Sequence, residues 1–175
     1  MSAGYGEISK AGFHKILTYM QNDVDDELKI TSNSSFIDIG SGFGKAVFHA
    51  KIVANVKTSD GVEYVSTRHI KAMELLQKFS STIDCSGIHF SQGDATQYKK
   101  FEYSHIYCYD YIFNETTHAA LLPIIEKSNC KLFVCFSKPA KLAKFGITKF
   151  DLINKFAVTT TGKQNFTVYF YKKKM

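Results

Sequence analysis

The sequence predicts an α/β fold: a mostly parallel, Rossmann-like sheet with helices on both faces, closed at its C-terminal end by an antiparallel hairpin. Three observations predict it. Strand-like and helix-like segments alternate along most of the chain, a glycine-rich turn stands between the first strand and the next helix, and two β-rich runs joined by a short turn come last. The 175 residues, 45% of them hydrophobic, are enough for one compact domain with a substantial core.

Short apolar runs bounded by turn residues mark the strands. The run Lys131–Ser137, which reads KLFVCFS, is typical of a strand buried on both faces. Four earlier strands are predicted at Phe36–Ile39, Lys57–Glu63, Gly87–Ser91 and His105–Asp110. The closing hairpin is predicted at Phe156–Thr161 and Phe166–Tyr171.

Apolar residues at helical spacing mark the helices. The predicted helices are Glu7 to about Met20, Lys45–Ala54, Thr67–Phe79 and Glu115–Lys127. The segment Asn22–Asn33 contains a cluster of acidic residues and is interpreted as a connection.

Charge is distributed unevenly along the chain. The formal net charge is +6, but residues 131–175 carry ten lysines and one acid, whereas residues 1–130 carry a net charge of −3. A basic C-terminal third favours an acidic partner or a nucleic acid, and a solvated lysine-rich face is the alternative. The chain has a single arginine, so bidentate recognition of base edges is not expected.

Membrane and metal-binding classes are not favoured. No apolar run approaches the roughly 20 residues that span a bilayer. None of the six histidines pairs with a second one at metal-ligand spacing, and the cysteines lack C-x2-C spacing, so we expect no metal. Unpaired cysteines in apolar runs favour an intracellular, reducing compartment, either the cytoplasm or the nucleus. The cysteines are Cys85, Cys108, Cys130 and Cys135.

The strongest chemical signal is the glycine-rich turn Asp38–Gly44, which reads DIGSGFG. Glycine allows a sharp turn and lets a ligand approach the backbone, and the amides at the start of the next helix can meet a carboxylate. A dinucleotide-binding turn would have its third glycine where Lys45 stands. The pattern instead resembles the S-adenosylmethionine-binding motif of class I methyltransferases, with a glycine turn that binds nothing as the alternative. The candidate cofactor-binding residues here are Asp38, Gly40, Ser41, Gly42, Gly44 and Lys45.

Acidic residues after the next two strands extend this candidate site. Glu63 ends the second strand, where a carboxylate can accept hydrogen bonds from ribose hydroxyls, and Tyr64 follows it. Gly93 and Asp94 follow the third strand, where this fold usually places a carboxylate near the adenine amino group. A solvent-facing Glu63 and an ordinary turn at Asp94 are the alternatives.

Five short motifs in order resemble one branch of the class I methyltransferases. It is the non-SET lysine methyltransferases typified by the disruptor-of-telomeric-silencing histone enzyme. The motifs are Tyr5-Gly6-Glu7, Phe36 to Gly44, Gly61-Val62-Glu63, Ser137-Lys138-Pro139 and Gly162-Lys163. The resemblance implies that Tyr5 and Glu7 belong to a segment that closes over S-adenosylmethionine. It thereby implies an N-terminal helix and cofactor-lid segment over residues 1–33 and a methyltransferase core over residues 34–175.

The chain departs from this family after the fourth strand. The family has N-N-F-x-F there, and this sequence has Tyr109-Asp110-Tyr111-Ile112-Phe113. Asp110-x-x-Phe113 also resembles the D/N-P-P-Y/F signature of class I enzymes that methylate nitrogen. The candidate catalytic residues are therefore Asp110, which would orient the amine, and the aromatic walls Tyr109, Tyr111 and Phe113, which Tyr107 would extend.

Three functions follow from these motifs. The first is an N-methyltransferase that modifies lysine side chains of a protein substrate. An acidic surface on that substrate would suit the lysine-rich C-terminal third. The second is a regulatory subunit that binds S-adenosylmethionine without turnover. The third is a nucleic-acid N-methyltransferase that uses the lysine-rich C-terminal third, with nearby aromatic residues stacking on a base.

Overall fold

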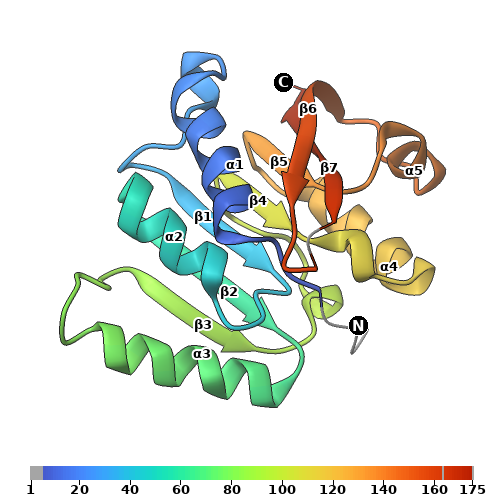
Figure 1. Ribbon diagram of the computed structural model, residues 1–175. Helices are drawn as coiled ribbons and strands as arrows, with labels where there is room; N and C mark the ends of the chain where they lie inside the picture. The colour runs from blue at the N-terminus through green and yellow to red at the C-terminus, as the bar shows by residue number, and fades with distance from the viewer. Residues whose placement is uncertain (1–5, 163, 175) are drawn as a thin grey trace.

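The computed structural model describes residues 6–162 and 164–174. A seven-stranded sheet in the order β3-β2-β1-β4-β5-β7-β6 forms its centre (Figure 1). Strands β1 to β5 pair in parallel, and β7 lies antiparallel between β5 and β6. The strands are β1 Ser35–Ile39, β2 Thr58–Glu63, β3 Ile88–Gln92, β4 His105–Cys108, β5 Leu132–Cys135, β6 Phe150–Thr159 and β7 Asn165–Lys173.

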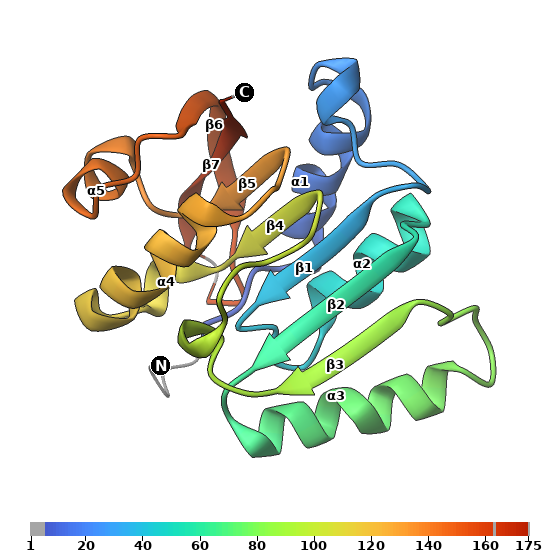
Figure 2. The same ribbon diagram turned by 180° about the vertical axis from the view of Figure 1, so that it is seen from behind.

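Helices cover both faces of the sheet, as the two opposite views show (Figures 1 and 2). Helices α1, α2 and α3 pack on one face, and α4 and α5 pack on the other. Their bounds are α1 Lys10–Asn22, α2 Lys45–Ala54, α3 Ser66–Phe79, α4 Glu115–Lys127 and α5 Pro139–Lys144. The predicted fold class is therefore confirmed.

Two apolar layers hold these helices to the sheet. On the first face, Phe13 of α1 packs against Phe36 of β1 and Tyr107 of β4. On the second face, α4 packs Leu121 and its apolar neighbours against the strands. Burial of this apolar surface is the main force that stabilises the fold.

Two predicted element starts are wrong, and one helix was missed. The first helix begins at Lys10 instead of Glu7, because Ser9 caps it by accepting a hydrogen bond from the Gly12 amide at 2.9 Å. Helix α5 was not predicted. Strand β6 begins at Phe150, six residues before the predicted start, because this edge strand is largely exposed and its polar residues hide the apolar alternation.

The strand order creates a crevice at the carboxyl end of the sheet. Strands β2 and β3 lie on one side of β1, and strands β4 and β5 lie on the other, so the order reverses between β1 and β4. Ligands of open α/β sheets bind at such a switch point, outside the carboxyl ends of the strands. The glycine-rich turn after β1 and the residues after β4 meet there.

Candidate functional site

A cavity lies at this switch point, between the ends of β1, β2 and β4 and the segment before α1. Several residues predicted from the sequence line it: Glu7, Asp38, Gly40, Ser41, Gly42, Lys45, Glu63, Tyr107 and Tyr109. The lining residues not singled out from the sequence include Ile8, Ala46, Arg68 and Ile112. Arg68 could have been noticed, because it is the only arginine of the chain and lies five residues after Glu63.

The glycine-rich turn has a backbone that only glycine adopts readily. Gly40, Gly42 and Gly44 have φ values of 81°, 55° and 87°, all in the left-handed region. Side chains at two of these positions would also collide with rings. A Cβ at Gly40 would lie 3.2 Å from Cζ of Phe113, and one at Gly44 would lie 2.4 Å from Cζ of Phe90.

Glu63, the last residue of β2, forms hydrogen bonds with this turn. Its Oε2 accepts a hydrogen bond from the Gly42 amide at 2.8 Å, and its Oε1 accepts one from the Val65 amide at 2.8 Å. Arg68 lies 3.8 Å from Oε1. Each carboxylate oxygen has a second lone pair, so Glu63 keeps the capacity to accept hydrogen bonds from a ligand.

Asp38 is a buried carboxyl group that faces the cavity. Its side chain is 5% exposed, and no hydrogen bond reaches it from the residues that the structure describes. Burial raises the pKa of Asp38 well above its ordinary value, and the nearby charges of Glu63 and Glu7 raise it further. Three carboxyl groups therefore line one cavity, an arrangement that favours a cationic ligand.

Two hydroxyl groups in the cavity wall are buried without a hydrogen-bond partner in the described part of the chain. They are Ser41 Oγ and Tyr107 Oη. Buried polar groups are nearly always hydrogen-bonded in folded proteins, because an unpaired one costs about 1–3 kcal/mol. Both hydroxyls are thus suited to bind a polar ligand in the cavity.

The segment before α1 closes one side of the cavity. Glu7 forms an ion pair of 2.8 Å with Lys45, whose Nζ also donates to the Ile8 carbonyl at 3.2 Å. The segment is joined to the hairpin as well, because Thr161 N–H donates to the Glu7 carbonyl at 3.0 Å. Tyr5, which the sequence places in the same lid, lies outside the described residues.

The three aromatic residues after β4 have different surroundings. Tyr109 lines the cavity, and its ring centroid is 4.7 Å from that of Phe136. Tyr111 is 57% exposed and lies 4.1 Å from the ring of Phe166 on β7, so aromatic rings extend from the cavity to the surface. Phe113 packs against Gly40.

Asp110, which the sequence analysis expected to orient the amine, is not among the residues that line the cavity. Its side chain is 3% exposed. Its Oδ1 accepts a hydrogen bond from the Phe136 amide at 2.7 Å, and its Oδ2 contacts the Ser137 hydroxyl and lies 3.2 Å from His118 Nε2. This direction continues the alternation of the strand, in which Tyr107 and Tyr109 lie on one face and Cys108 on the other.

Three further predicted residues also lie away from the cavity lining. Asp94 accepts a hydrogen bond from the Thr96 amide at 2.9 Å and so caps a short 3-10 turn, as the turn alternative expected. Gly93 N–H donates to the Glu63 carbonyl at 2.9 Å, and Tyr64 is an exposed side chain. The structure therefore does not place these three residues in the lining that contains Asp38.

Acidic residues from elsewhere in the chain offset part of the basic C-terminal third. Lys172 lies 2.8 Å from Glu27, which belongs to the acidic connection after α1. Lys144 lies 2.6 Å from Glu115 at the start of α4. At least these two lysines of the C-terminal third are therefore paired with acids from the first 130 residues.

Within residues 6–162 and 164–174, no helix has the length and apolar character needed to cross a membrane. In the same residues, no three or more His, Cys, Asp or Glu side chains gather as metal ligands would.

Comparisons with known proteins agree with this geometry. The family model described as "Histone methylation protein DOT1" matches residues 2–117, more than half of the chain. No curated protein sequence matches the chain at a significant level.

Solved structures with the same fold are distant in sequence. Magnesium protoporphyrin IX methyltransferase from Synechocystis PCC 6803, solved with bound SAH, has a TM-score of 0.74 at 11% identity, over 94% of this chain and 82% of that one. A putative RNA methyltransferase from Pyrococcus horikoshii has a TM-score of 0.68 at 15% identity, over 93% and 83%. The tRNA methyltransferase TrmK from B. subtilis has a TM-score of 0.65 at 16% identity, over 93% and 65%.

The seven-stranded sheet and its glycine-rich turn define an S-adenosylmethionine-dependent methyltransferase of class I. S-Adenosylmethionine, expected from the sequence, is the cofactor of this class. Within the class, the chain belongs to the DOT1 family of histone methylation proteins. The family match ends at residue 117, so Ser137-Lys138-Pro139 and the hairpin glycine lie beyond it.

Proposed function

We propose that the chain transfers a methyl group from S-adenosylmethionine to the side-chain nitrogen of lysine in a protein substrate. The observation that carries this proposal is the row of aromatic rings from the cavity to the surface, made by Tyr109, Phe136, Tyr111 and Phe166. Such a row fits the long apolar stem of lysine and brings its nitrogen to the cavity. The DOT1 family match supports a protein substrate.

The cavity residues fit the cofactor. S-Adenosylmethionine supplies an electrophilic methyl group on a cationic sulfonium, and it also carries an ammonium group and ribose hydroxyls. Asp38 would attract the cationic groups, Glu63 would accept hydrogen bonds from the ribose, and Ser41 Oγ would take a polar partner that it lacks among the described residues. Gly40 and Gly42 would let the cofactor contact the backbone.

The acceptor nitrogen must lose its proton before it attacks. A lysine ammonium has an ordinary pKa of about 10.4, and transfer into an apolar environment favours the neutral amine. Tyr109 and Phe113 would supply that environment and exclude water, and the surrounding rings would align the amine for attack. Burial raises the pKa of Tyr109, so its hydroxyl stays protonated and adds no negative charge.

A labelling experiment tests this proposal. The purified chain and S-adenosylmethionine with a radiolabelled methyl group are incubated with a cell extract, and the extract is then treated with protease or nuclease. We expect label that protease releases and nuclease does not, and acid hydrolysis should yield methyllysine. The matched control is Gly42→Val, which puts a β-branched residue at a φ of 55° and should abolish both cofactor binding and label.

Nucleic-acid methylation is a second candidate, supported by a specific observation. Two of the similar structures are described as methyltransferases of RNA or tRNA. The exposed ring of Tyr111 and lysines of α5 such as Lys141 could bind a base and a backbone. Label released by nuclease would favour this candidate, whereas cofactor binding without label in either pool would favour a regulatory subunit.

A further inference from the structure

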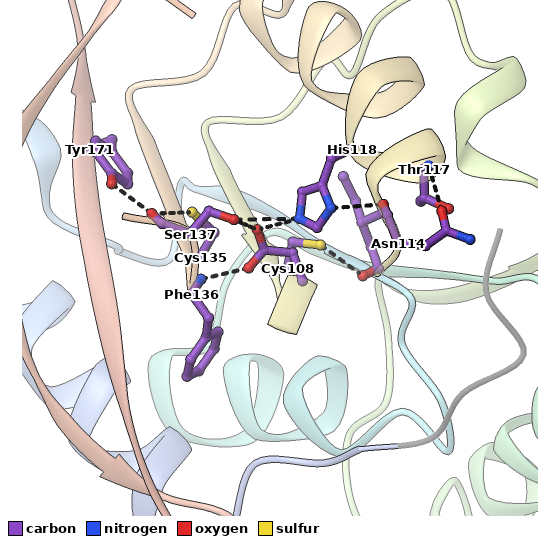
Figure 3. Close-up of polar contacts among 10 residues, drawn as sticks. Cys108, Asn114, Thr117, His118, Cys135, Phe136, Ser137 and Tyr171 are labelled. Carbon is purple, nitrogen blue, oxygen red and sulfur yellow. Dashed lines mark hydrogen bonds and ion pairs between the residues drawn. The ribbon is translucent and has the colours of Figure 1, made fainter. Parts of the chain in front are cut away.

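A buried polar cluster joins α4 to the turns after β4 and β5, and no sequence motif singled out its histidine. The cluster consists of Asp110, His118 and Ser137, each less than 5% exposed. Figure 3 shows His118 reaching from α4 toward Ser137 at the end of β5. The cluster thus joins three elements that are far apart in the sequence.

The hydrogen-bond pattern fixes the role of each atom of His118. Nδ1 lies 2.9 Å from the carbonyl oxygen of Asn114, and a carbonyl only accepts, so Nδ1 carries a proton. Nε2 is left to face Asp110 Oδ2 at 3.2 Å and Ser137 Oγ at 3.4 Å. Ser137 Oγ contacts the same Oδ2, so all three side chains of the cluster have partners.

The cluster also fixes the position of the turn after β4, which forms one wall of the cavity. Asp110 begins the 3-10 turn Asp110–Ile112, between Tyr109 and Phe113. Asp110 Oδ1 binds the Phe136 amide, so the turn after β4 is fastened to the end of β5. Tyr109 and Ile112 line the cavity, and Phe113 packs on Gly40. A shift of Asp110 would therefore move the rings that face the acceptor.

We propose that His118 is a positioning residue for methyl transfer. His118 is not among the residues that line the cavity. Its ring holds the Asp110 carboxylate in place, and Asp110 in turn fixes the aromatic row against the cofactor cavity. Misplacement of reacting groups by small distances costs large factors in rate, so His118 should affect transfer without affecting cofactor affinity. The kinetic part of this proposal rests on the proposed function.

Two amide replacements separate the two nitrogens of the ring. In His118→Gln the side-chain amide reaches about as far as Nε2 and can still donate to Asp110. In His118→Asn the amide reaches only as far as Nδ1 and can bind the Asn114 carbonyl alone. Both variants lose the ring and its stacking on Phe145, so their difference isolates the contact with Asp110.

Hydrogen exchange of the full-length chain, with calorimetric titration of S-adenosylhomocysteine, tests the proposal. In His118→Asn we expect exchange of the Phe136 amide and the turn after β4 to accelerate by about tenfold or more. His118→Gln should stay within about threefold of the natural protein, and both variants should bind the ligand within about twofold. Methyl transfer to the cell extract should slow in His118→Asn and stay close to that of the natural protein in His118→Gln.

Two outcomes would overturn the proposal. One is equal exchange in both variants and the natural protein. The other is loss of ligand binding in both variants together with faster exchange throughout the sheet, which indicates a general structural role. If the natural protein labels nothing, the proposed function fails, and the exchange difference still decides whether His118 fixes the turn.

Discussion

Two buried aspartates at the ends of neighbouring strands have opposite surroundings. Asp38 in β1 and Asp110 just after β4 are 5% and 3% exposed. Asp110 is met by a backbone amide, a hydroxyl and an imidazole, whereas no described residue donates a hydrogen bond to Asp38. Asp38 instead shares its cavity with the carboxylates of Glu7 and Glu63, which help to raise its pKa.

The two aspartates are equally buried, so their hydrogen-bond partners distinguish a structural carboxyl group from one left open to a ligand. A buried carboxylate with three donors stabilises the fold, because its desolvation is compensated within the chain. A buried carboxylate without donors costs stability until a ligand supplies the compensation. The two aspartates should therefore respond to the same substitution with opposite signs.

The largest expected effect is on cofactor binding at Asp38. Asp38→Asn removes the negative charge that attracts the cationic cofactor, and we expect affinity for S-adenosylmethionine to fall about a hundredfold or more. Calorimetric titration measures it. Asp110→Asn is the matched control and should bind within about threefold of the natural protein. Unchanged affinity in Asp38→Asn would remove Asp38 from the site.

The second effect is on the stability of the ligand-free protein. Asp110→Asn puts an amide beside three donors, and we expect the free energy of unfolding to fall by about 2–3 kcal/mol. Asp38→Asn removes an uncompensated buried carboxyl group and should raise it by about 1 kcal/mol. Urea unfolding monitored by tyrosine fluorescence measures both. A change of the same sign in the two variants would contradict the comparison.

The third effect is a dependence on pH that follows from the raised pKa of Asp38. The folded protein holds this proton more tightly than the unfolded chain does, so its stabilising contribution is present below the unfolded pKa and is lost as pH rises through the folded pKa. Cofactor binding needs the carboxylate and should change in the opposite direction, strengthening as pH rises.

Thermal unfolding between pH 5 and pH 8 measures this effect, with and without S-adenosylhomocysteine. The stability advantage of Asp38→Asn over the natural protein should grow with pH, and the ligand-induced stabilisation of the natural protein should grow as well. A constant difference across the range would show that the pKa of Asp38 is not raised.

The sequence predicted the Asp38 side of the site better than the Asp110 side, for a physical reason. The glycine-rich turn is local: its residues are contiguous, its backbone needs glycine, and its partner Glu63 ends the next strand. The surroundings of Asp110 depend on Phe136 and Ser137, which lie 26 and 27 residues further along the chain. Side chains alternate along β4 and its end, with Tyr107 and Tyr109 on one face and Cys108 on the other, so alternation places Asp110 on the face covered by α4. No local pattern shows which groups meet it there.

The same reasoning applies to the parts of the fold that were missed. Strand β6 could not be delimited because an edge strand with exposed polar residues lacks the apolar run that marks β5. Helix α5 has six residues, too few for a periodic pattern. By contrast, α2 and α4 have the predicted bounds, since both carry several buried apolar residues at helical spacing.

The smallest expected effect uses two tyrosines that repeat the contrast between the aspartates. Tyr107 and Tyr171 are each 2% exposed, but Tyr171 donates its hydroxyl proton to the Ser137 carbonyl at 2.7 Å, whereas the Tyr107 hydroxyl has no partner in the described part of the chain. Tyr107→Phe should weaken S-adenosylmethionine binding about fivefold and leave the ligand-free stability unchanged or slightly higher. Tyr171→Phe should lower that stability by about 1 kcal/mol and leave the affinity within about twofold. Calorimetry and urea unfolding of both variants decide the matter: if Tyr107→Phe loses stability instead of affinity, its hydroxyl belongs to the core and not to the cofactor site.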